Sequence, residues 1–502
     1  MAMTRPTAPD GNDPVDGGRP SVLHVTQPVD GGVAVYVAAV AGDQARRGWN
    51  VAVACPAGGP LRERLGELGV RWLEWSARRS PGPDDLGSAR RLRRLVGGFG
   101  PQAVHLHSSK AGMVGRAVIR GAVPTIFQPH GWSWLACQGA MAKAVLSWER
   151  WAARWADLLV CVGEGEARLA GERGLSGPLT VVRNGVDLDR FRPAGGEARE
   201  AARRRYGLAE RAPLAVCVGR VTRQKGQDLL VAAWERVRES CPDATLAIVG
   251  DGDLRDGLRP AAGPGVVFAD QVDDPRAWYA AADVVVLPSR WEGLPLTALE
   301  ALASGRCLVA SDIPGLAELV TGEIGEVVPV GETGPLAEAL ARRLGDLALA
   351  REEGRAAAIR AQAFDLGPAL DLLADHTLRL VGSTGVVRAG DRRETRDLGV
   401  ASGGPDSLGG ESRDLGVDSS GSDSLGPATG LCGFTGGLTG RTAGTAGLPN
   451  GPRRSSRPQG RSGSTEEGMS PGIEDPGEPD SVSRKARAER AFDGQVQTPC
   501  GQ

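Results

Sequence analysis

The sequence lacks several features that would place it in other classes of protein. Its eight cysteines stand singly and form no Cys-x-x-Cys pair, which argues against a zinc site or a disulfide framework and fits a reducing cytoplasm. No uncharged apolar run approaches the roughly 20 residues that a membrane span needs. The formal net charge is only -2, so nothing global points to nucleic acid. The first 20 residues lack the apolar core of a signal peptide, and we therefore expect a cytoplasmic protein.

Between residue 21 and about residue 380, short apolar runs alternate with stretches of helical length. This alternation predicts an α/β fold with parallel sheets covered on both faces. The runs form two series, which predict two doubly wound domains at residues 21–195 and 205–365, followed by a helix at 366–381. The predicted strands are Val22–Thr26, Val51–Ala54, Ala103–Leu106, Thr125–Phe127, Leu158–Val162 and Thr180–Val182, then Leu214–Val218, Thr245–Val249, Val266–Phe268, Val284–Leu287, Cys307–Ala310 and Glu326–Val328.

The two ends of the chain have a different composition. Residues 1–20 are polar and rich in Pro, Gly and Asp, and residues 382–502 are dominated by Gly, Ser, Pro, Arg and Asp. Such segments cannot bury enough apolar surface to offset chain entropy. We therefore predict that both are disordered.

The most informative stretch is PSRWEGLPLTALEALASG at residues 288–305, directly after an apolar run. It predicts a strand, a turn through Gly293 and a helix that begins near Pro295. Glu292 then lies beside free amides at the start of the helix, and Glu300 lies in the helix body. Carboxylates at these two positions can accept hydrogen bonds from sugar hydroxyls and from a ribose diol. The alternative is that both are ordinary surface glutamates.

Glu292 and Glu300, with seven residues between them, resemble the signature of the retaining glycosyltransferases of family 4. The resemblance covers roughly residues 21–380 and implies the GT-B fold, in which two Rossmann-like domains face each other across a cleft. It implies a nucleoside-diphosphate sugar as donor, with Glu292, Gly293, Leu294 and Glu300 in the donor site. It also implies no resident cofactor and no metal, because enzymes of this fold neutralise the diphosphate with basic side chains and helix dipoles.

A second stretch, VGRVTRQKG at residues 218–226, follows the first predicted strand of the second domain. The resemblance implies that Gly219, Arg220 and Lys225 contact the donor diphosphate, where two cations would stabilise charge on the leaving group. A solvated basic loop is the alternative. Asp251, in a Gly-Asp-Gly turn after another predicted strand, lines the nucleotide pocket or simply closes a loop.

In the first domain, Gly31 and Gly32 follow the first predicted strand, where adjacent glycines let the backbone approach a ligand. His130 follows another strand, at the edge where such sheets bind ligands, and the resemblance implies that it faces the transferred sugar. Asn184 either reaches the cleft or makes the turn that Asn-Gly favours. Lys110, in a motif similar to that of bacterial exopolysaccharide glycosyltransferases, either meets an anionic acceptor or belongs to a basic helix N-terminus.

Two further patterns have competing explanations. Asp-x-Asp strings begin at Asp187 and Asp251, but such metal-holding pairs belong to glycosyltransferases of another fold, so we assign no metal. Trp148, Trp151 and Trp155 share one helical face. Together with Trp132 and Trp134 they favour either a membrane-interface patch or a stripe that faces the core.

The expected reaction is retaining transfer, in which a phosphate oxygen of the leaving group takes the proton of the acceptor hydroxyl. The catalytic set is then His130, Arg220, Lys225 and Glu292, and the two glutamates are not a glycosidase pair. The expected acceptor is a lipid-linked saccharide at the membrane surface, in exopolysaccharide or cell-envelope glycan synthesis, and no nucleic-acid partner is expected. A nucleotide-sugar 2-epimerase of the same fold, a transferase acting on a small metabolite and a non-catalytic sugar-nucleotide-binding protein are the alternatives.

Overall fold

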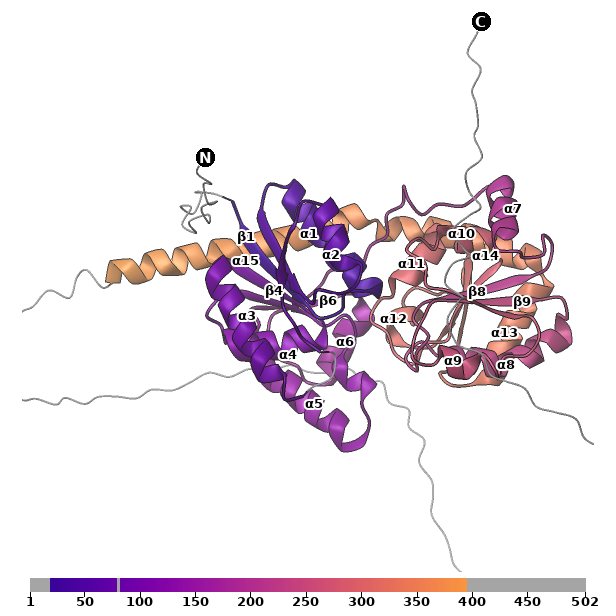
Figure 1. Ribbon diagram of the computed structural model, residues 1–502, viewed down its shortest axis with the longest axis horizontal. Helices are drawn as coiled ribbons and strands as arrows, with labels where there is room; N and C mark the ends of the chain where they lie inside the picture. Colours follow the sequence, from indigo (N-terminus) through magenta and orange to yellow (C-terminus); the bar gives the residue numbers. More distant parts are fainter. Residues whose placement is uncertain (1–18, 79–81, 395–502) are drawn as a thin grey trace, which may run out of the picture. The chain divides into compact units, whose positions relative to one another are not determined.

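The computed structural model describes residues 19–78 and 82–394, which contain two parallel β-sheets (Figure 1). Within these residues the first sheet has seven strands, in the order β3-β2-β1-β4-β5-β6-β7. The strands are β1 (Ser21–Thr26), β2 (Asn50–Cys55), β3 (Arg71–Glu74), β4 (Ala103–His107), β5 (Thr125–Gln128), β6 (Leu158–Cys161) and β7 (Leu179–Val181).

The second sheet has six strands among the described residues, in the order β10-β9-β8-β11-β12-β13. They are β8 (Leu214–Val218), β9 (Thr245–Val249), β10 (Val266–Ala269), β11 (Val284–Leu287), β12 (Cys307–Ser311) and β13 (Gly325–Val328). All pairings in both sheets are parallel. The predicted pair of doubly wound sheets is therefore confirmed.

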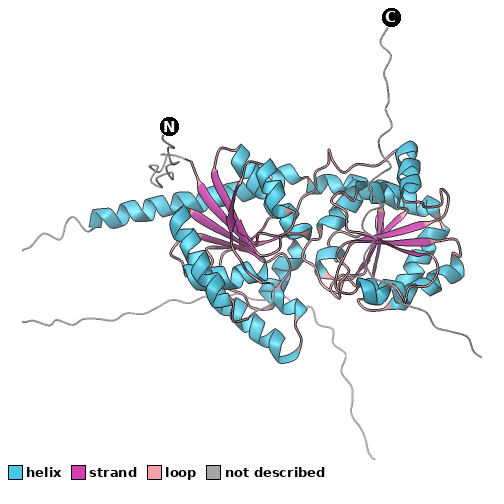
Figure 2. Ribbon diagram, in the orientation of Figure 1, coloured by secondary structure: helices cyan, strands magenta, loops and turns pink. Residues whose placement is uncertain are grey.

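Helices cover both faces of each sheet, as Figure 2 shows. The helices of the first domain are α1 (Gly31–Arg46), α2 (Leu61–Glu67), α3 (Asp85–Phe99), α4 (Ser108–Ile119), α5 (Gly139–Ala152) and α6 (Glu164–Glu172). Those that follow are α7 (Gly196–Arg205), α8 (Gln227–Ser240), α9 (Arg255–Leu258), α10 (Arg276–Ala281), α11 (Leu296–Ala303), α12 (Pro314–Ala317), α13 (Thr333–Gly345), α14 (Leu347–Ala361) and α15 (Leu366–Glu394). Because helices bury both faces of the sheets, the strands read as continuous apolar runs.

The order of the strands fixes where ligands bind. In each sheet the first strand of the domain lies between two neighbours, and the chain leaves in opposite directions on its two sides. The crevice outside the carboxyl ends of β1 and β4, and of β8 and β11, is the place where such sheets bind ligands. The loops singled out in the sequence follow these strands and β5.

All twelve predicted strands are present, with ends that differ by at most one residue. The prediction missed β3, whose sequence Arg-Trp-Leu-Glu has only two apolar residues between two charges. This strand lies at the edge of its sheet and is only partly buried, so it needs no longer apolar run.

The structure adds one helix that was not predicted and corrects the predicted end of another. The segment between the two predicted domains contains the helix α7. Its buried Arg203 forms an ion pair with Asp283, with Nη2 and Oδ2 2.8 Å apart. The final helix does not end at residue 381 but continues to Glu394, because each added residue of an established helix gains one hydrogen bond. The predicted disorder of residues 1–18 and 395–502 lies outside the described residues.

The five tryptophans, predicted to form either a membrane-interface patch or a stripe facing the core, form two separate groups. Trp132 and Trp134 are buried and stack with ring centroids 4.5 Å apart, so they belong to the core. Trp148, Trp151 and Trp155 form a separate cluster at the end of α5, and Trp151 is 45% exposed. Two arginine guanidinium groups lie over rings of this cluster. It is therefore neither a buried stripe nor continuous with the other pair.

Candidate active site

Glu292 and Lys225, which the sequence assigns to separate tasks, are in direct contact. Nζ of Lys225 lies 2.7 Å from Oε1 of Glu292, and both side chains are largely buried. Ser289 donates to the same carboxylate oxygen at 3.0 Å, and Gln224 approaches the other oxygen at 3.4 Å. The loop after β8 and the loop after β11 are thus joined by a hydrogen-bonded carboxylate. A ligand at this place meets a charge-paired, preorganised group.

Arg220 lies opposite the glycine loop of the first domain. A Cβ atom on Gly31 would lie 3.9 Å from Nε of Arg220, and one on Gly32 would lie 3.9 Å from the Leu296 side chain. Gly31 has a φ of 66°, a conformation that favours glycine, and it begins α1. Arg220 forms no ion pair with any described residue. A guanidinium beside the amides at a helix start is a suitable site for a phosphate.

Glu300 lies in α11 as predicted, and the phenol of Tyr279 donates to its Oε2 at 2.9 Å. Burial raises the pKa of Glu300 to about 7, against the smaller effect of that hydrogen bond. Tyr279 on α10 therefore orients a carboxyl that is close to half-ionised near neutral pH. A carboxylate held in this way can accept both hydrogen bonds of a diol.

His130 occupies a strained turn after β5. Its φ is 54°, in the left-handed region that a histidine rarely adopts. Glu166 on α6 fixes the turn, because its carboxylate accepts the amide of Gly131 at 2.5 Å and that of Val162 at 2.8 Å. Burial lowers the pKa of His130 to about 3, so the imidazole is neutral at pH 7. A neutral ring can bind a hydroxyl or face a developing positive charge.

The turn of His130 touches the loop of Glu292. A Cβ on Gly131 would lie 3.5 Å from the amide nitrogen of Gly293, and a Cβ on Gly293 would lie 2.8 Å from a Val162 methyl. A Cβ on Gly315 would meet the Gly293 carbonyl oxygen at 1.3 Å. Only glycine fits where these backbones meet. The structure thus brings His130, Glu292, Lys225, Arg220 and the glycine loop to one place.

Comparisons with known proteins identify the family of the chain. The family model described as Glycosyltransferase Family 4 matches residues 30–190, and that described as Glycosyl transferases group 1 matches residues 212–346. The chain is 30% identical over 318 residues to an Escherichia coli UDP-Gal:alpha-D-GlcNAc-diphosphoundecaprenol alpha-1,3-galactosyltransferase, covering 60% of this chain and 81% of that one. The chain belongs to glycosyltransferase family 4. It is therefore a glycosyltransferase.

Other relatives of this glycosyltransferase are bacterial sugar transferases as well. A GDP-mannose-dependent alpha-(1-6)-phosphatidylinositol monomannoside mannosyltransferase of Mycolicibacterium smegmatis is 34% identical over 281 residues, covering 52% of this chain and 70% of that one. Among solved structures, the sucrose-phosphate synthase of Thermosynechococcus elongatus matches with a TM-score of 0.63 and 22% identity, covering 73% of this chain and 100% of that one. HepE of Anabaena, solved with UDP, matches with a TM-score of 0.60 and 20% identity, covering 71% and 99%. These likenesses show the GT-B fold.

Four predicted donor residues have structural roles. Asn184 is buried and donates from Nδ2 to the carbonyl of Leu294 at 2.6 Å, so it connects the end of the first domain to the loop after β11. The Leu294 side chain is buried. Asp251 is exposed and accepts the amide of Gly252 at 2.8 Å, which closes its own turn. Gly219 has a φ of 149° and lies under the Lys225 side chain.

Lys110, the predicted acceptor residue, is buried in α4. Its Nζ lies 2.7 Å from Oδ1 of Asp85 on α3. The neighbouring Gly112 and Gly115 lie against Phe127 and Leu106, respectively. This motif therefore has a packing role in the structure, and the acceptor role of Lys110 stays a prediction.

Four supporting side chains of the site were not predicted from the sequence: Ser289, Gln224, Tyr279 and Glu166. Ser289 and Gln224 lie inside the two stretches described above, so their position next to Glu292 and Lys225 could have indicated a role in the site. Tyr279 and Glu166 are distant in sequence from the residues they hold. No local pattern could have connected them.

The Asp-x-Asp string at Asp187 makes a turn, because its Oδ1 accepts the amides of Asp189 and Arg190 at 3.1 Å and 2.9 Å. Among the described residues, one group of side chains has metal-ligand composition: His24, His105 and His107, whose ligand atoms all lie within 4.8 Å of one another. The absence of a resident metal and cofactor stays a prediction.

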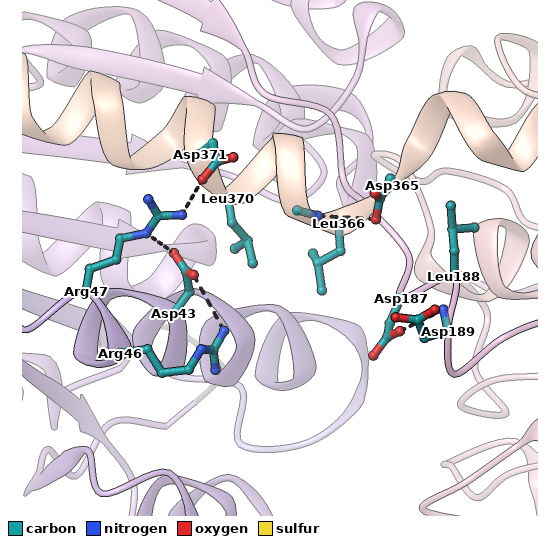
Figure 3. A pocket seen from close by; sticks show the side chains of 11 residues that line it. Asp43, Arg46, Arg47, Asp187, Leu188, Asp189, Asp365, Leu366, Leu370 and Asp371 are labelled. Carbon is teal, nitrogen blue, oxygen red and sulfur yellow. Dashed lines mark hydrogen bonds and ion pairs between the residues drawn. The ribbon is translucent and has the colours of Figure 1, made fainter.

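Away from these loops lies a cavity of about 490 Å³ between α1 and the start of α15 (Figure 3). Asp43 binds Arg47 at 2.6 Å there, and Arg47 also binds Asp371. These ion pairs join α1 to α15, and the lining contains no predicted site residue. In the part of the chain that the structure describes, no helix is long and apolar enough to cross a membrane.

Proposed function

We propose that this glycosyltransferase moves a sugar from a nucleoside-diphosphate sugar to an acceptor hydroxyl with retention of anomeric configuration. The observation that carries the proposal is the convergence of Arg220, the Lys225–Glu292 pair and the Gly31 loop at the carboxyl ends of the two sheets. Two cations beside helix-start amides suit a diphosphate, and Glu300 with its Tyr279 partner suits a ribose diol.

The arrangement favours retention because neither Glu292 nor His130 is suited to act as a separate base for the acceptor. Glu292 is paired with Lys225 and hydrogen-bonded by Ser289, so its ionised form binds rather than abstracts. His130 is neutral, and the burial that lowers its pKa makes it a poor base at pH 7. A phosphate oxygen of the departing diphosphate, stabilised by Arg220 and Lys225, takes the acceptor proton.

The proposed acceptor is a lipid-linked saccharide, used in exopolysaccharide or cell-envelope glycan synthesis at the inner face of the membrane. Two relatives support it, since one is named for transfer to a diphosphoundecaprenol-linked sugar and the other for transfer to a phosphatidylinositol monomannoside. The cluster of Trp148, Trp151 and Trp155, with arginines over its rings, has the composition of a surface that rests on anionic lipid.

The test begins with a screen of UDP-, GDP-, ADP- and dTDP-sugars for thermal stabilisation. A donor at 100 times its dissociation constant adds about 2.7 kcal/mol. The best donor is then supplied with a polyprenyl diphosphate saccharide or a small sugar acceptor, and proton NMR of the product gives the anomeric configuration. Transfer to the lipid-linked acceptor with retention is expected. A product with inverted anomeric configuration would refute retention. Transfer to small sugars alone would refute the proposal of a lipid-linked acceptor. Epimerisation of the donor without any acceptor would identify a 2-epimerase.

A further inference from the structure

Four of the five histidines in the sequence lie side by side in the first domain. Three of them form a hydrogen-bonded row that begins at Gln44 on α1. Nε2 of His24 lies 2.8 Å from Oε1 of Gln44, and its Nδ1 lies 3.0 Å from Nε2 of His107. Nδ1 of His107 lies 3.1 Å from Nε2 of His130. A buried row thus connects α1 with the candidate site residue His130.

Every imidazole in this row is neutral at pH 7. Burial lowers the pKa of His24 to about 4 and that of His130 to about 3, and it lowers the pKa of His107 well below its usual value. A neutral imidazole carries one N–H, and each contact between two ring nitrogens needs one proton. The three rings must therefore all donate in the same direction along the row. Only two arrangements are possible, and they differ in which nitrogen of His130 carries the proton.

Gln44 selects between the two arrangements. Its Oε1 faces Nε2 of His24, and a carbonyl oxygen only accepts; with the amide placed in this way, Nε2 of Gln44 is buried and has no partner among the described residues. His24 therefore donates from Nε2 to Gln44 and accepts at Nδ1 from Nε2 of His107. His107 in turn accepts at its Nδ1 from Nε2 of His130. Nδ1 of His130 is left with a lone pair. It has no hydrogen-bond partner among residues 19–78 and 82–394, and the His130 residue is partly exposed.

We propose that Gln44, His24 and His107 are positioning residues that fix the Nε2–H tautomer of His130 and so present a lone pair to the transferred sugar. The proposal rests on the proposed function for the place of the sugar. It determines the chemistry that His130 recognises: a hydroxyl that donates, or an anomeric carbon that becomes positive. A carbonyl or carboxylate oxygen at the same place would be repelled.

His105 provides the matched control. Its ring centroid lies 3.9 Å from that of His107, but neither of its ring nitrogens has a hydrogen bond of good geometry to a described residue. The Gln128 side chain acts to raise its pKa, against a larger lowering by burial. A substitution of His105 therefore disturbs packing beside the row without interrupting it.

The direct experiment is nitrogen-15 NMR of the full chain labelled only at histidine, at pH 7.5. Long-range proton–nitrogen correlations distinguish the two tautomers, and single substitutions assign the five residues. The proposal predicts the Nε2–H tautomer for His24, His107 and His130. An Nδ1–H tautomer at His130 would overturn it. So would a stoichiometric metal found by elemental analysis, since a metal bound by His24 and His107 needs both facing nitrogens free.

The kinetic experiment uses Gln44→Met, which keeps the side-chain volume but removes the acceptor. We expect a mixed tautomer at His130 and a kcat lowered at least about tenfold, with the dissociation constant of the donor unchanged. His105→Leu should keep the tautomer and a kcat within about threefold of wild type. In a His107→Leu background, Gln44→Met should have no further effect. A loss of kcat of the same size in that background would show that Gln44 does not act through the histidine row. The tautomer is read without any turnover, so it can fail while the proposed function stands.

Discussion

Glu300 is a buried carboxyl group, and a ligand that binds to it should change its ionisation. Burial raises its pKa to about 7, and Tyr279, Arg190, Asp274 and Lys225 are the groups that act on it. The ionised form accepts hydrogen bonds on both oxygens and so suits both hydroxyls of a ribose diol, whereas the protonated form uses one oxygen as a donor and binds the diol less well. Donor binding should therefore release a proton below pH 7, and binding should tighten as the pH rises.

We predict that donor affinity increases between pH 6 and pH 8 by up to about tenfold and then levels off. In Glu300→Gln the affinity is lower and nearly independent of pH over this range. Titration calorimetry with the intact sugar nucleotide measures both proteins, and that donor has no group of its own that titrates here. A flat wild-type profile, or the same slope in the variant, would show that Glu300 is not the group involved.

The raised pKa of Glu300 makes the stability of the ligand-free protein fall as the pH rises, whereas donor affinity is expected to increase. Because the folded value is above the ordinary value of 4.5, the proton on Glu300 stabilises the fold fully below pH 4.5. That contribution is lost as the pH rises toward 7. Glu166, whose pKa burial also raises to about 7, behaves alike. The difference in the pH dependence of the free energy of unfolding between wild type and Glu300→Gln gives the contribution of Glu300.

Single side chains of the site could be predicted from the sequence where a motif contains them. Glu292, Lys225 and Arg220 lie in two short stretches, and the structure brings them together. The ion pair itself could not be predicted, because it depends on how two loops meet. Nor could Asn184 be assigned to the carbonyl of Leu294, 110 residues away in the chain.

At the scale of elements, α4 shows why a helix has glycines in its interior. A Cβ on Gly112 would lie 2.2 Å from the Phe127 ring, and one on Gly115 would lie 2.4 Å from Leu106. The helix packs so closely on β4 and β5 that no side chain fits. Gly97 in α3 differs, because a Cβ there meets nothing within 4 Å.

We predict that Gly112→Ala destabilises the fold by about 1–3 kcal/mol, although alanine is the better helix former. Gly97→Ala should instead stabilise it by roughly 0.5–1 kcal/mol, because it gains helix propensity without a clash. Urea unfolding followed by circular dichroism compares the two. Equal effects of both substitutions would mean that α4 lies further from the sheet.

Elements were predictable where burial on both faces makes their pattern strong. The twelve predicted runs all form strands, whereas the edge strand β3, with two apolar residues between two charges, was not predicted. The extension of α15 to Glu394 was missed because the residues after 381 include glycine and serine. Composition predicted a break there, but propagation from the packed helix decides the backbone.

At the scale of the whole molecule, the two sheets explain why residues from distant parts of the chain meet. Parallel strands bring their carboxyl ends to one edge, and each domain contributes loops beside its central pair of strands. The glycine loop and the His130 turn come from the first domain, and Arg220, Lys225 and Glu292 come from the second. Gly131 and Gly293 meet where only glycine fits. The candidate site is therefore built from loops of both domains.

The most direct test of this account is the rate of sugar transfer by Glu292→Ala and Lys225→Ala with the donor found by screening. We predict that each variant loses at least about 100-fold in kcat/KM, equivalent to roughly 3 kcal/mol of transition-state stabilisation. Glu338→Ala is the matched control, since it breaks an exposed pair with Arg236. It should transfer at the wild-type rate. Near-wild-type transfer by either site variant would contradict the assignment of the donor site.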